Sequence, residues 1–233
     1  MTTSGTYTFV ENFSIVQCID EAFRRCKVTP EMITSEHLLS AQISLDLMFI
    51  GWVNDGVNQF VIDQQIQTLL GDGTDISFTT PVGTVDILSM VFRNASNTDM
   101  EISAISRQDY QDISQKTTGG QPVNYWVDKT TIQPVCYLWP VQDVTGTYVV
   151  YNRVRQIQDT GNYTNTPDTT VLYKDAICAC LADLLWDKYG DDTVYPNQGA
   201  KLALRAQKAY DIAQEQDRDR SQLVIKPCLG RRY

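Results

Sequence analysis

The 233-residue sequence predicts an α+β fold: a helical bundle formed by the N- and C-terminal helices, with an antiparallel β-sandwich or open-barrel domain inserted between them. Three observations support this prediction. Near both ends of the chain, apolar residues recur every three or four positions, as in amphipathic helices. Between these segments the apolar period shortens to two, as in strands. Apolar residues make up 42% of the chain, which is enough for a hydrophobic core.

Residues 1–56 are predicted to form a helical hairpin. A first helix over 12–26 has a regular apolar face, and Pro30 separates it from the next element. Thr34 or Ser35 can cap a second helix, in which Leu38, Ala41, Leu45, Met48 and Trp52 form the apolar stripe. His37 lies in the first turn of this helix, where it is expected to be a polar contact or a subunit-interface residue rather than a metal ligand.

Residues 57–157 are predicted to form the inserted β-domain. The alternation is seen near 62–70, 123–128 and 147–157, and the other strands are expected at 84–93, 98–105 and 133–139. In the first of these, Ile62, Ile66 and Leu70 are expected to share the apolar face. Arg153 and Arg155 put positive charge on one strand face, which we interpret as solvated or as a partner-binding patch.

Residues 158–220 return to helix and complete the bundle. The segment around 176–185 is apolar on nearly all sides, so this helix should be the most buried element, with Leu181 and Leu184 in the core. An alanine-rich helix follows from about 197 to 218. Residues 221–233 form an extended tail that is too short to be a domain and too apolar to stay comfortably in water, so we expect it to dock on its own domain or on a partner.

Composition excludes several classes of function. The formal net charge of −9 disfavours a sequence-independent DNA-binding surface, which needs clustered Lys and Arg, but allows a protein through which DNA passes. The single histidine disfavours His-dependent metal sites and catalytic triads. The six cysteines lack a CxxC pair and are expected to be buried free thiols, with Cys178 and Cys180 on different sides of one helix. No apolar run reaches the length of a membrane span, and the first residues lack a secretory signal, which favours synthesis in the cytoplasm.

The stretch "ISRQDYQDISQKTTGGQP" (105–122) is the strongest candidate for an active-site loop. Ser106 and Asp109 have the spacing of a capping box, which predicts a short helix over 107–113 and a structural joint. The alternative is that Asp109, Tyr110, Asp112 or Lys116 serves as acid, base or ligand. The acidic string "GDGTD", with Asp72 and Asp75, lacks the ligand set of a calcium loop and is expected to be a turn.

Two C-terminal segments are candidates for contacts between chains. In "EQDRDR" the charges alternate in sign, which favours ion pairs with neighbouring subunits or solvent. The subunit-interface candidates are His37, Glu215, Asp217, Arg218, Asp219 and Arg220. The tail combines an apolar strip with basic residues, and its candidates for docking on a partner are Leu223, Val224, Ile225, Lys226, Arg231 and Arg232.

Several strings, in this order, resemble the head-to-tail adaptor family of tailed bacteriophages, the neck proteins that include tail-tubular and packaged-DNA-stabilising proteins. They are "ITSEHLLSAQISLDLMFIGWVNDGVNQF", "ISRQDY...GGQPVNYWVD", "PVCYLWPVQD", "YVVYNRVRQIQDTGNYTNTPD" and "AYDIAQEQDRDRSQLVIKP". The resemblance covers nearly the whole chain, although no single string is as diagnostic as a zinc or nucleotide-binding motif.

The resemblance implies a non-enzymatic ring in the virion neck, usually of twelve copies, without a cofactor. Such a ring sits beneath the portal, extends the DNA channel, retains the packaged genome and docks the next tail or nozzle protein. It implies helices facing the portal, a β-domain facing outward or towards the tail, and a C-terminal tail that anchors to the portal protein. Double-stranded DNA would pass through the ring without sequence recognition, and no membrane contact is implied.

Two other classes of function stay open at this stage. A glycan-binding module of a tail or surface protein would use exposed aromatic residues, of which Tyr125, Trp126 and Trp139 are the candidates. A hydrolase or nuclease would use a metal held by the carboxylates of Asp109 and Asp112.

Overall fold

The computed structural model describes residues 13–55 and 59–218. Two helices, α1 (Ile15–Arg25) and α2 (Ser35–Asp55), begin the described chain, separated by a 3₁₀ turn, η1, at Pro30–Met32. Thr34 precedes α2, and its hydroxyl accepts a hydrogen bond from the His37 amide at 3.3 Å. The His37 ring nitrogen Nδ1 in turn accepts one from the Thr34 amide at 3.2 Å. His37 therefore takes the place that Glu or Gln has in a capping box.

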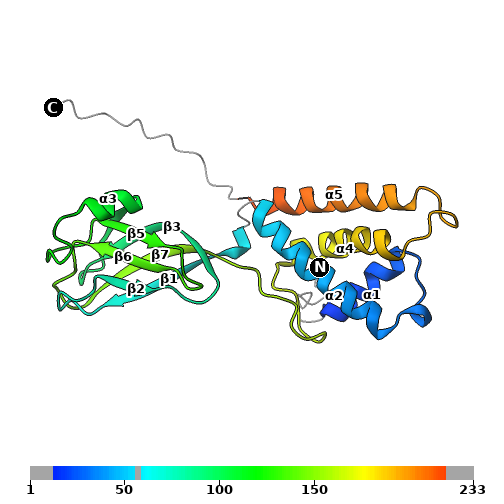
Figure 1. The fold of residues 1–233 in the computed structure, drawn as a ribbon, viewed down its shortest axis with the longest axis horizontal. Coiled ribbons are helices and arrows are strands. Elements are labelled where there is room, and N and C mark those ends of the chain that lie inside the picture. Colours follow the sequence, from blue (N-terminus) through cyan, green and yellow to red (C-terminus); the bar gives the residue numbers. More distant parts are fainter. Residues whose placement is uncertain (1–12, 56–58, 219–233) are drawn as a thin grey trace, which may run out of the picture.

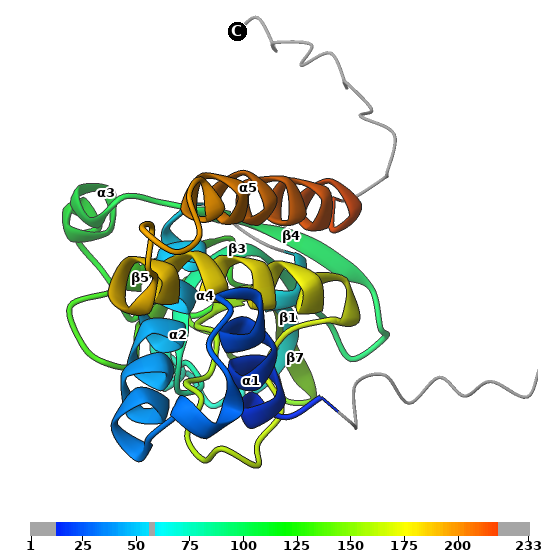
Figure 2. The same ribbon diagram turned by 90° about the vertical axis from the view of Figure 1, so that its right-hand side faces the viewer.

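Two further helices, α4 (Lys174–Tyr189) and α5 (Gln198–Gln216), follow the β-region, and a 3₁₀ turn, η3 (Val171–Tyr173), leads into α4. The helix α4 lies between α5 on one side and α1 and α2 on the other (Figure 2). Its side chains are buried on nearly every side, as its sequence predicts. The core of this helical module includes Phe23, Leu45, Ile177, Leu181 and Leu185, all fully buried.

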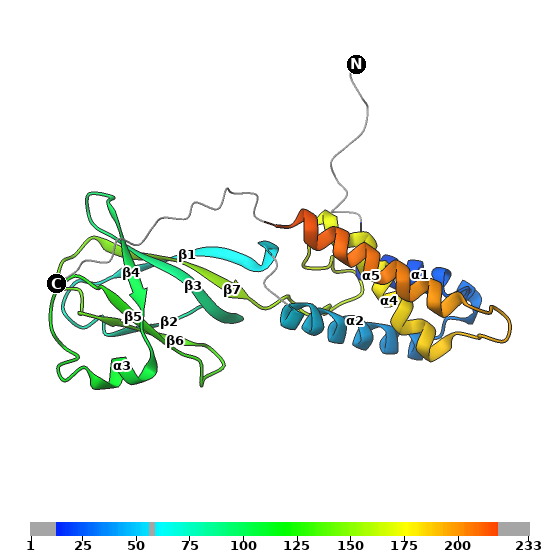
Figure 3. The same ribbon diagram turned by 90° about the horizontal axis from the view of Figure 1, so that it is seen from above.

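Between the helices the chain forms a 3₁₀ turn, η2 (Gln59–Val61), and a seven-stranded sheet. The elements are β1 (Ile62–Leu69), β2 (Ser77–Thr79), β3 (Thr84–Arg93), β4 (Asp99–Ala104), the short helix α3 (Arg107–Asp112), β5 (Asn124–Asp128), β6 (Val135–Trp139) and β7 (Thr147–Arg155). The strand order is β1-β7-β3-β4-β5-β6-β2, and the sheet curls into a half-barrel around a second hydrophobic core. The molecule is elongated, with the sheet at one end and the helices at the other (Figures 1 and 3).

The predicted α+β class, with strands between the terminal helices, is confirmed. Two details of the sheet differ from the expectation. The strand β2 was not predicted, because three residues are too few for a period of two to show. The pairing of β4 with β5 is parallel, whereas all other strand pairs are antiparallel. The connection over 105–123, which contains α3, carries the chain back so that β5 runs in the direction of β4.

The inner face of β1 is the opposite of the predicted one. Ile66 and Leu70 are 61% and 65% exposed, whereas Leu69 is buried. Asp63 shares the inner face with Leu69 because residues two apart in a strand point to the same side. Asp63 lies opposite Arg153 in the register and pairs with it, so a buried charge pair decides which face of β1 turns inward.

The prediction that Leu184 lies in the core is also wrong. Leu181 and Leu185 are fully buried, whereas Leu184 is 37% exposed. A helix that is apolar all round has no polar face to mark the side that meets solvent, so its sequence cannot distinguish these positions. Among the described residues, no helix has the length and apolarity needed to span a membrane.

The neighbouring leucines Leu184 and Leu185 give a matched test of this packing. Leu185→Ala is expected to lower the free energy of unfolding by about 2 to 5 kcal/mol, because it empties a fully buried site. Leu184→Ala is expected to cost less than about 1 kcal/mol, because its side chain is partly in solvent. Urea denaturation of the two variants measures the difference, and equal losses would contradict the assigned orientation of α4.

Candidate functional site

The stretch 105–122 forms a structural joint rather than a pocket. The Ser106 amide donates to Oδ2 of Asp109 at 3.2 Å, and the Asp109 amide donates to Oγ of Ser106 at 3.1 Å, so the predicted capping box is present at the start of α3. At the other end of α3, Nζ of Lys116 donates to the carbonyls of Tyr110 and Ile113 at 2.8 and 2.9 Å. These contacts satisfy backbone groups that a short helix leaves unpaired.

The carboxylates proposed for hydrolysis have local structural partners. Asp109 is held by Ser106, and Oδ1 of Asp112 accepts from Nε2 of Gln108 at 3.0 Å. Across residues 13–55 and 59–218, no group of three or more His, Cys, Asp or Glu side chains is arranged to hold a metal ion. The geometry therefore gives the hydrolase alternative no support.

The aromatic residues of the glycan alternative do not form an exposed platform. Tyr125 is only 4% exposed. Trp126 forms a cluster with Tyr110 and Tyr137, in which the three ring centroids lie 5.1 to 5.4 Å from one another. Nε1 of Trp139 donates to a carbonyl in the 105–122 stretch at 3.1 Å. These rings pack the joint against β5 and β6, and the prediction that Tyr125 is exposed is wrong.

The acidic string at 71–75 is a turn, as predicted. The Gly71 amide donates to Oδ2 of Asp75 and the Thr74 amide donates to Oδ1 of Asp72, both at 2.9 Å. Gly71 has a φ of 69°, and a Cβ there would lie 2.2 Å from the carbonyl oxygen of Val144. Glycine is required at this position both by the left-handed backbone and by the close approach of the neighbouring chain.

The cysteines within the described ranges are free thiols, as predicted, and Cys228 lies outside those ranges. Burial raises the pKa of Cys26 to about 12 and also raises that of Cys136. Cys178 and Cys180 point to different sides of α4: Cys178 contacts Cys18 of α1, and Cys180 donates a weak hydrogen bond to a carbonyl of α5. These thiols fill the core and are not an exposed reactive site.

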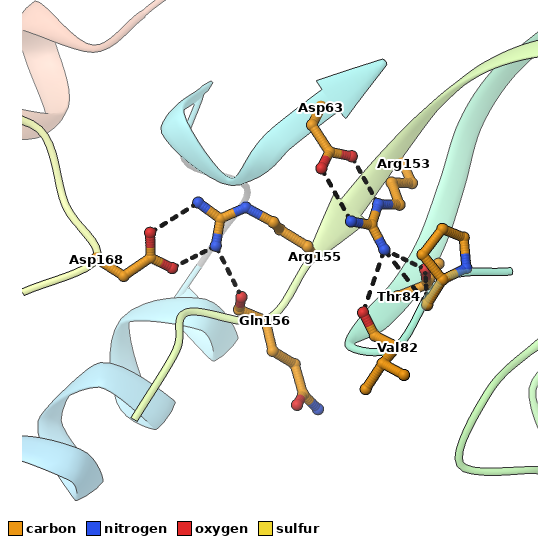
Figure 4. A network of polar contacts seen from close by, with 8 residues as sticks. Asp63, Val82, Thr84, Arg153, Arg155, Gln156 and Asp168 are labelled. Carbon is orange, nitrogen blue, oxygen red and sulfur yellow. Dashed lines mark hydrogen bonds and ion pairs between the residues drawn. The ribbon is translucent and has the colours of Figure 1, made fainter. Parts of the chain in front are cut away.

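Arg153 ties three elements of the half-barrel together (Figure 4). The guanidinium donates to both carboxylate oxygens of Asp63, at 2.6 and 2.9 Å, and to Oγ1 of Thr84 at 2.8 Å. Two backbone carbonyls before β3 accept further bonds from it. Arg153 is only 7% exposed, so the expectation of a solvated or partner-binding arginine face is wrong at this position. Its charge is retained inside because five acceptor atoms surround it.

Arg155 extends the same network towards the helices. Its guanidinium pairs with both carboxylate oxygens of Asp168, in the loop that leads from β7 to α4 (Figure 4). Oδ2 of Asp168 also accepts from the Gln158 amide at 3.0 Å. Farther along this loop, the Thr160 amide donates to Oδ1 of Asp46 in α2 at 2.9 Å. Side-chain contacts thus fix the junction between the sheet and the helices. Their partners lie at separate positions in the sequence, so no local pattern predicts these contacts.

The predicted subunit-interface residues are dispersed. His37 caps α2 and packs edge-on against Tyr189, with ring centroids 4.6 Å apart. Oδ2 of Asp217 accepts from the Gln59 amide at 2.8 Å and from the Tyr173 hydroxyl at 3.3 Å. Glu215 and Arg218 are exposed at the end of α5. Asp219 and Arg220 lie outside the described residues, as do all six tail candidates: Leu223, Val224, Ile225, Lys226, Arg231 and Arg232.

The pair between Asp63 and Arg153 should make stability depend on pH. The hydrogen bond from Arg153 holds the pKa of Asp63 below its usual range. The contribution of the ionised Asp63 to the free energy of unfolding is therefore complete above its unfolded-state pKa of about 3.9. This contribution is lost as the pH falls through the lower pKa of Asp63 in the folded state. At pH 7, Asp63→Asn should cost about 2 to 3 kcal/mol, less than a fully buried pair, because the carboxylate is one-third exposed.

Asp99 supplies a matched control, because it forms the same two-oxygen contact with Arg93, at 2.6 and 2.8 Å, in the more exposed hairpin between β3 and β4. Asp99→Asn is expected to change stability little. Chemical denaturation at pH 7 and again below pH 4 measures both variants. A deficit of Asp63→Asn that stays constant as the pH falls below 4 would contradict the assignment.

In the described residues, the predicted site residues are thus engaged in capping and packing. The model of the SU10 adaptor protein family matches residues 29–226, which spans the second helix, the whole sheet and the C-terminal helices. A comparison with curated proteins finds no match. Because the family model covers well over half of the chain, the resemblance to phage adaptors is confirmed, and the chain belongs to the SU10 adaptor protein family, a family of phage head-to-tail adaptors.

Proposed function

We propose that this adaptor forms a ring beneath the portal in the virion neck, extends the DNA channel, retains the packaged genome and docks the next tail or nozzle protein. The family match over residues 29–226 carries the proposal. The polar groups of the 105–122 stretch agree with it, since they are engaged in capping and packing. The role that we propose for the protein is therefore structural, without catalysis or a cofactor.

The charge of the chain suits a channel for DNA. A net charge of −9 gives a ring of many copies a strongly negative surface. Double-stranded DNA is repelled by such a surface and can slide past it without sequence recognition. Twelve copies is the number that we propose, from the usual symmetry of such rings.

The elongated shape suggests how one subunit could serve two partners. The helices and the half-barrel occupy opposite ends of the molecule (Figure 3). We place the helical end against the portal and the sheet outward or towards the tail. Residues 1–56 and 158–220 would then form the portal-side domain and residues 57–157 the distal domain, with 221–233 as the portal anchor.

Ring formation is tested by measuring mass with and without the portal. The purified chain mixed with its portal should give a complex that holds a closed ring of adaptor subunits, visible in native mass spectrometry and in electron-microscopy class averages. A chain that is monomeric alone and assembles only on the portal agrees with the proposal. A chain that never joins the portal contradicts it.

The tail has its own test. Deleting residues 221–233 should leave circular dichroism and the melting temperature nearly unchanged, because the helix α5 and its core end before them. Portal docking should be lost and capsids should leak DNA. A truncated protein that unfolds would place the tail within its own fold, and one that docks normally would place the anchor elsewhere.

A further inference from the structure

The outer side of α2 carries a stripe of exposed apolar residues. Leu39, Ile43, Leu47 and Ile50 are each more than half exposed, and their spacing of four, four and three places them on one face of the helix. The opposite face of α2 is occupied by core residues. Single exposed apolar residues are common on proteins, but an ordered series on one helix marks an interaction surface. We call these four residues the α2 stripe.

Gly51 is a second sign that this face is covered in the assembled protein. It lies in the interior of α2, next to Ile50 of the stripe. Glycine destabilises a helix interior relative to alanine, so its presence needs a reason. The described part of the chain supplies none, because a Cβ at Gly51 would meet none of its atoms within 4 Å. A glycine here leaves room for another surface to approach the helix.

The charges on α2 indicate the kind of surface that fits. Its charged residues at neutral pH are Glu36, Asp46 and Asp55, and it contains no Lys or Arg. Glu36 and Asp55 are exposed at the two ends of the stripe. An occupant should therefore combine apolar side chains with positive charge.

The N-terminal part of one face of α5 on the same chain has this composition. Lys201, Leu204, Lys208 and Ile212 follow one another at helical spacing, and we call them the α5 face. Leu204 is 70% exposed and Ile212 is 45% exposed. The first three turns of α5 hold Lys201, Arg205 and Lys208 but no acidic residue. Within the described chain, neither Lys201 nor Lys208 forms an ion pair.

We propose that the α2 stripe of one copy packs against the α5 face of a second copy. The two surfaces belong to helices on opposite sides of α4 (Figure 2), so each copy presents one surface to each neighbour. Contacts of this kind, between two different surfaces, repeat around a ring, whereas identical surfaces pair and stop at a dimer. Pairing α2 with α2 would also bring the acidic ends of two helices together. This inference rests on the proposed ring and states which surfaces close it.

Site-specific photocrosslinking identifies the occupant directly. A photoreactive phenylalanine derivative at Leu47, in the full chain assembled on its portal, should crosslink to residues of 201–212 in another copy. The same group at Leu88, an exposed residue of β3, serves as the control and should not crosslink to that segment. Crosslinks from Leu47 to α2 of another copy, or to the portal protein alone, would overturn the inference.

Two sets of substitutions test the contact without a chemical probe. The Leu204→Asp, Lys208→Asp variant alters only α5, yet it should reduce ring formation at least tenfold, as should the Ile43→Asp, Leu47→Asp variant of α2. Both should keep the melting temperature of the isolated chain, because these side chains are exposed. Rings that form normally in the α5 variant would show that α2 pairs with something else.

Gly51→Leu adds a steric test. The isolated chain has open space at this position and should melt at the same temperature as the wild type, or higher, while ring formation falls. Normal rings from Gly51→Leu would overturn the inference. If the wild-type chain itself never forms a ring on the portal, the proposed function fails, and the inference fails with it. If rings form but Leu47 crosslinks elsewhere, only the inference fails.

Discussion

The helix α4 imposes the main constraint on this molecule, because most of its apolar side chains must be kept from water. Eight of its residues are buried, on nearly every side of the helix. Three other helices are needed to cover it, and polar contacts fix their positions. Arg25 of α1 reaches Asp175 at 2.8 Å, and Lys188 reaches the hydroxyl of Ser44 in α2 at 2.7 Å. Each covering helix uses one face for this purpose, which leaves Leu47 of α2 and Leu204 of α5 exposed on the outward faces.

The sheet depends on a different kind of contact. The strand β7, which lies between β1 and β3, brings Arg153 into the half-barrel, and Asp63 and Thr84 hold the charge there. Arg155, two residues after Arg153 on the same strand, pairs with Asp168 beyond the end of the sheet. Residues two apart on one strand thus connect the sheet internally and join it to the loop that leads to the helices. A strand cannot carry side chains of this length inward without a defined set of acceptors.

The sequence predicts the long, periodic elements well. The stripe from Ala41 to Trp52 places α2 and its buried face correctly, and the strand expected at 84–93 coincides with β3. Other features depend on partners distant in sequence. The inward position of Asp63 depends on Arg153, ninety residues later, and no local pattern contains that information. The sequence pattern does not distinguish Leu184 from Leu185. They differ in exposure because the neighbouring helices cover the side of α4 that carries Leu185 and leave Leu184 partly in solvent.

The candidate site was predicted less fully than the fold. The capping box of Ser106 and Asp109 was evident from spacing, because both partners lie within one helical turn. The α2 stripe was overlooked because α2 is apolar on two faces, and the core face explains an apolar helix by itself. The signal was present in Leu39, Ile43 and Leu47, which recur every four residues between the core positions. In such sequences, a helix with one apolar face in the core and a second apolar stripe on another face indicates a candidate interaction surface.

The pairing of β1 with β7 also has a consequence for how this protein can change. Ile62, where the chain enters the sheet, lies opposite Val154, where it leaves. The entire half-barrel is therefore an insertion whose two ends are neighbours, joined to the helices through a single narrow attachment. Segments with adjacent ends can be lengthened, shortened or exchanged without moving the structure that carries them. In evolutionary terms such an insertion can vary while the packing of the helices around α4 is kept.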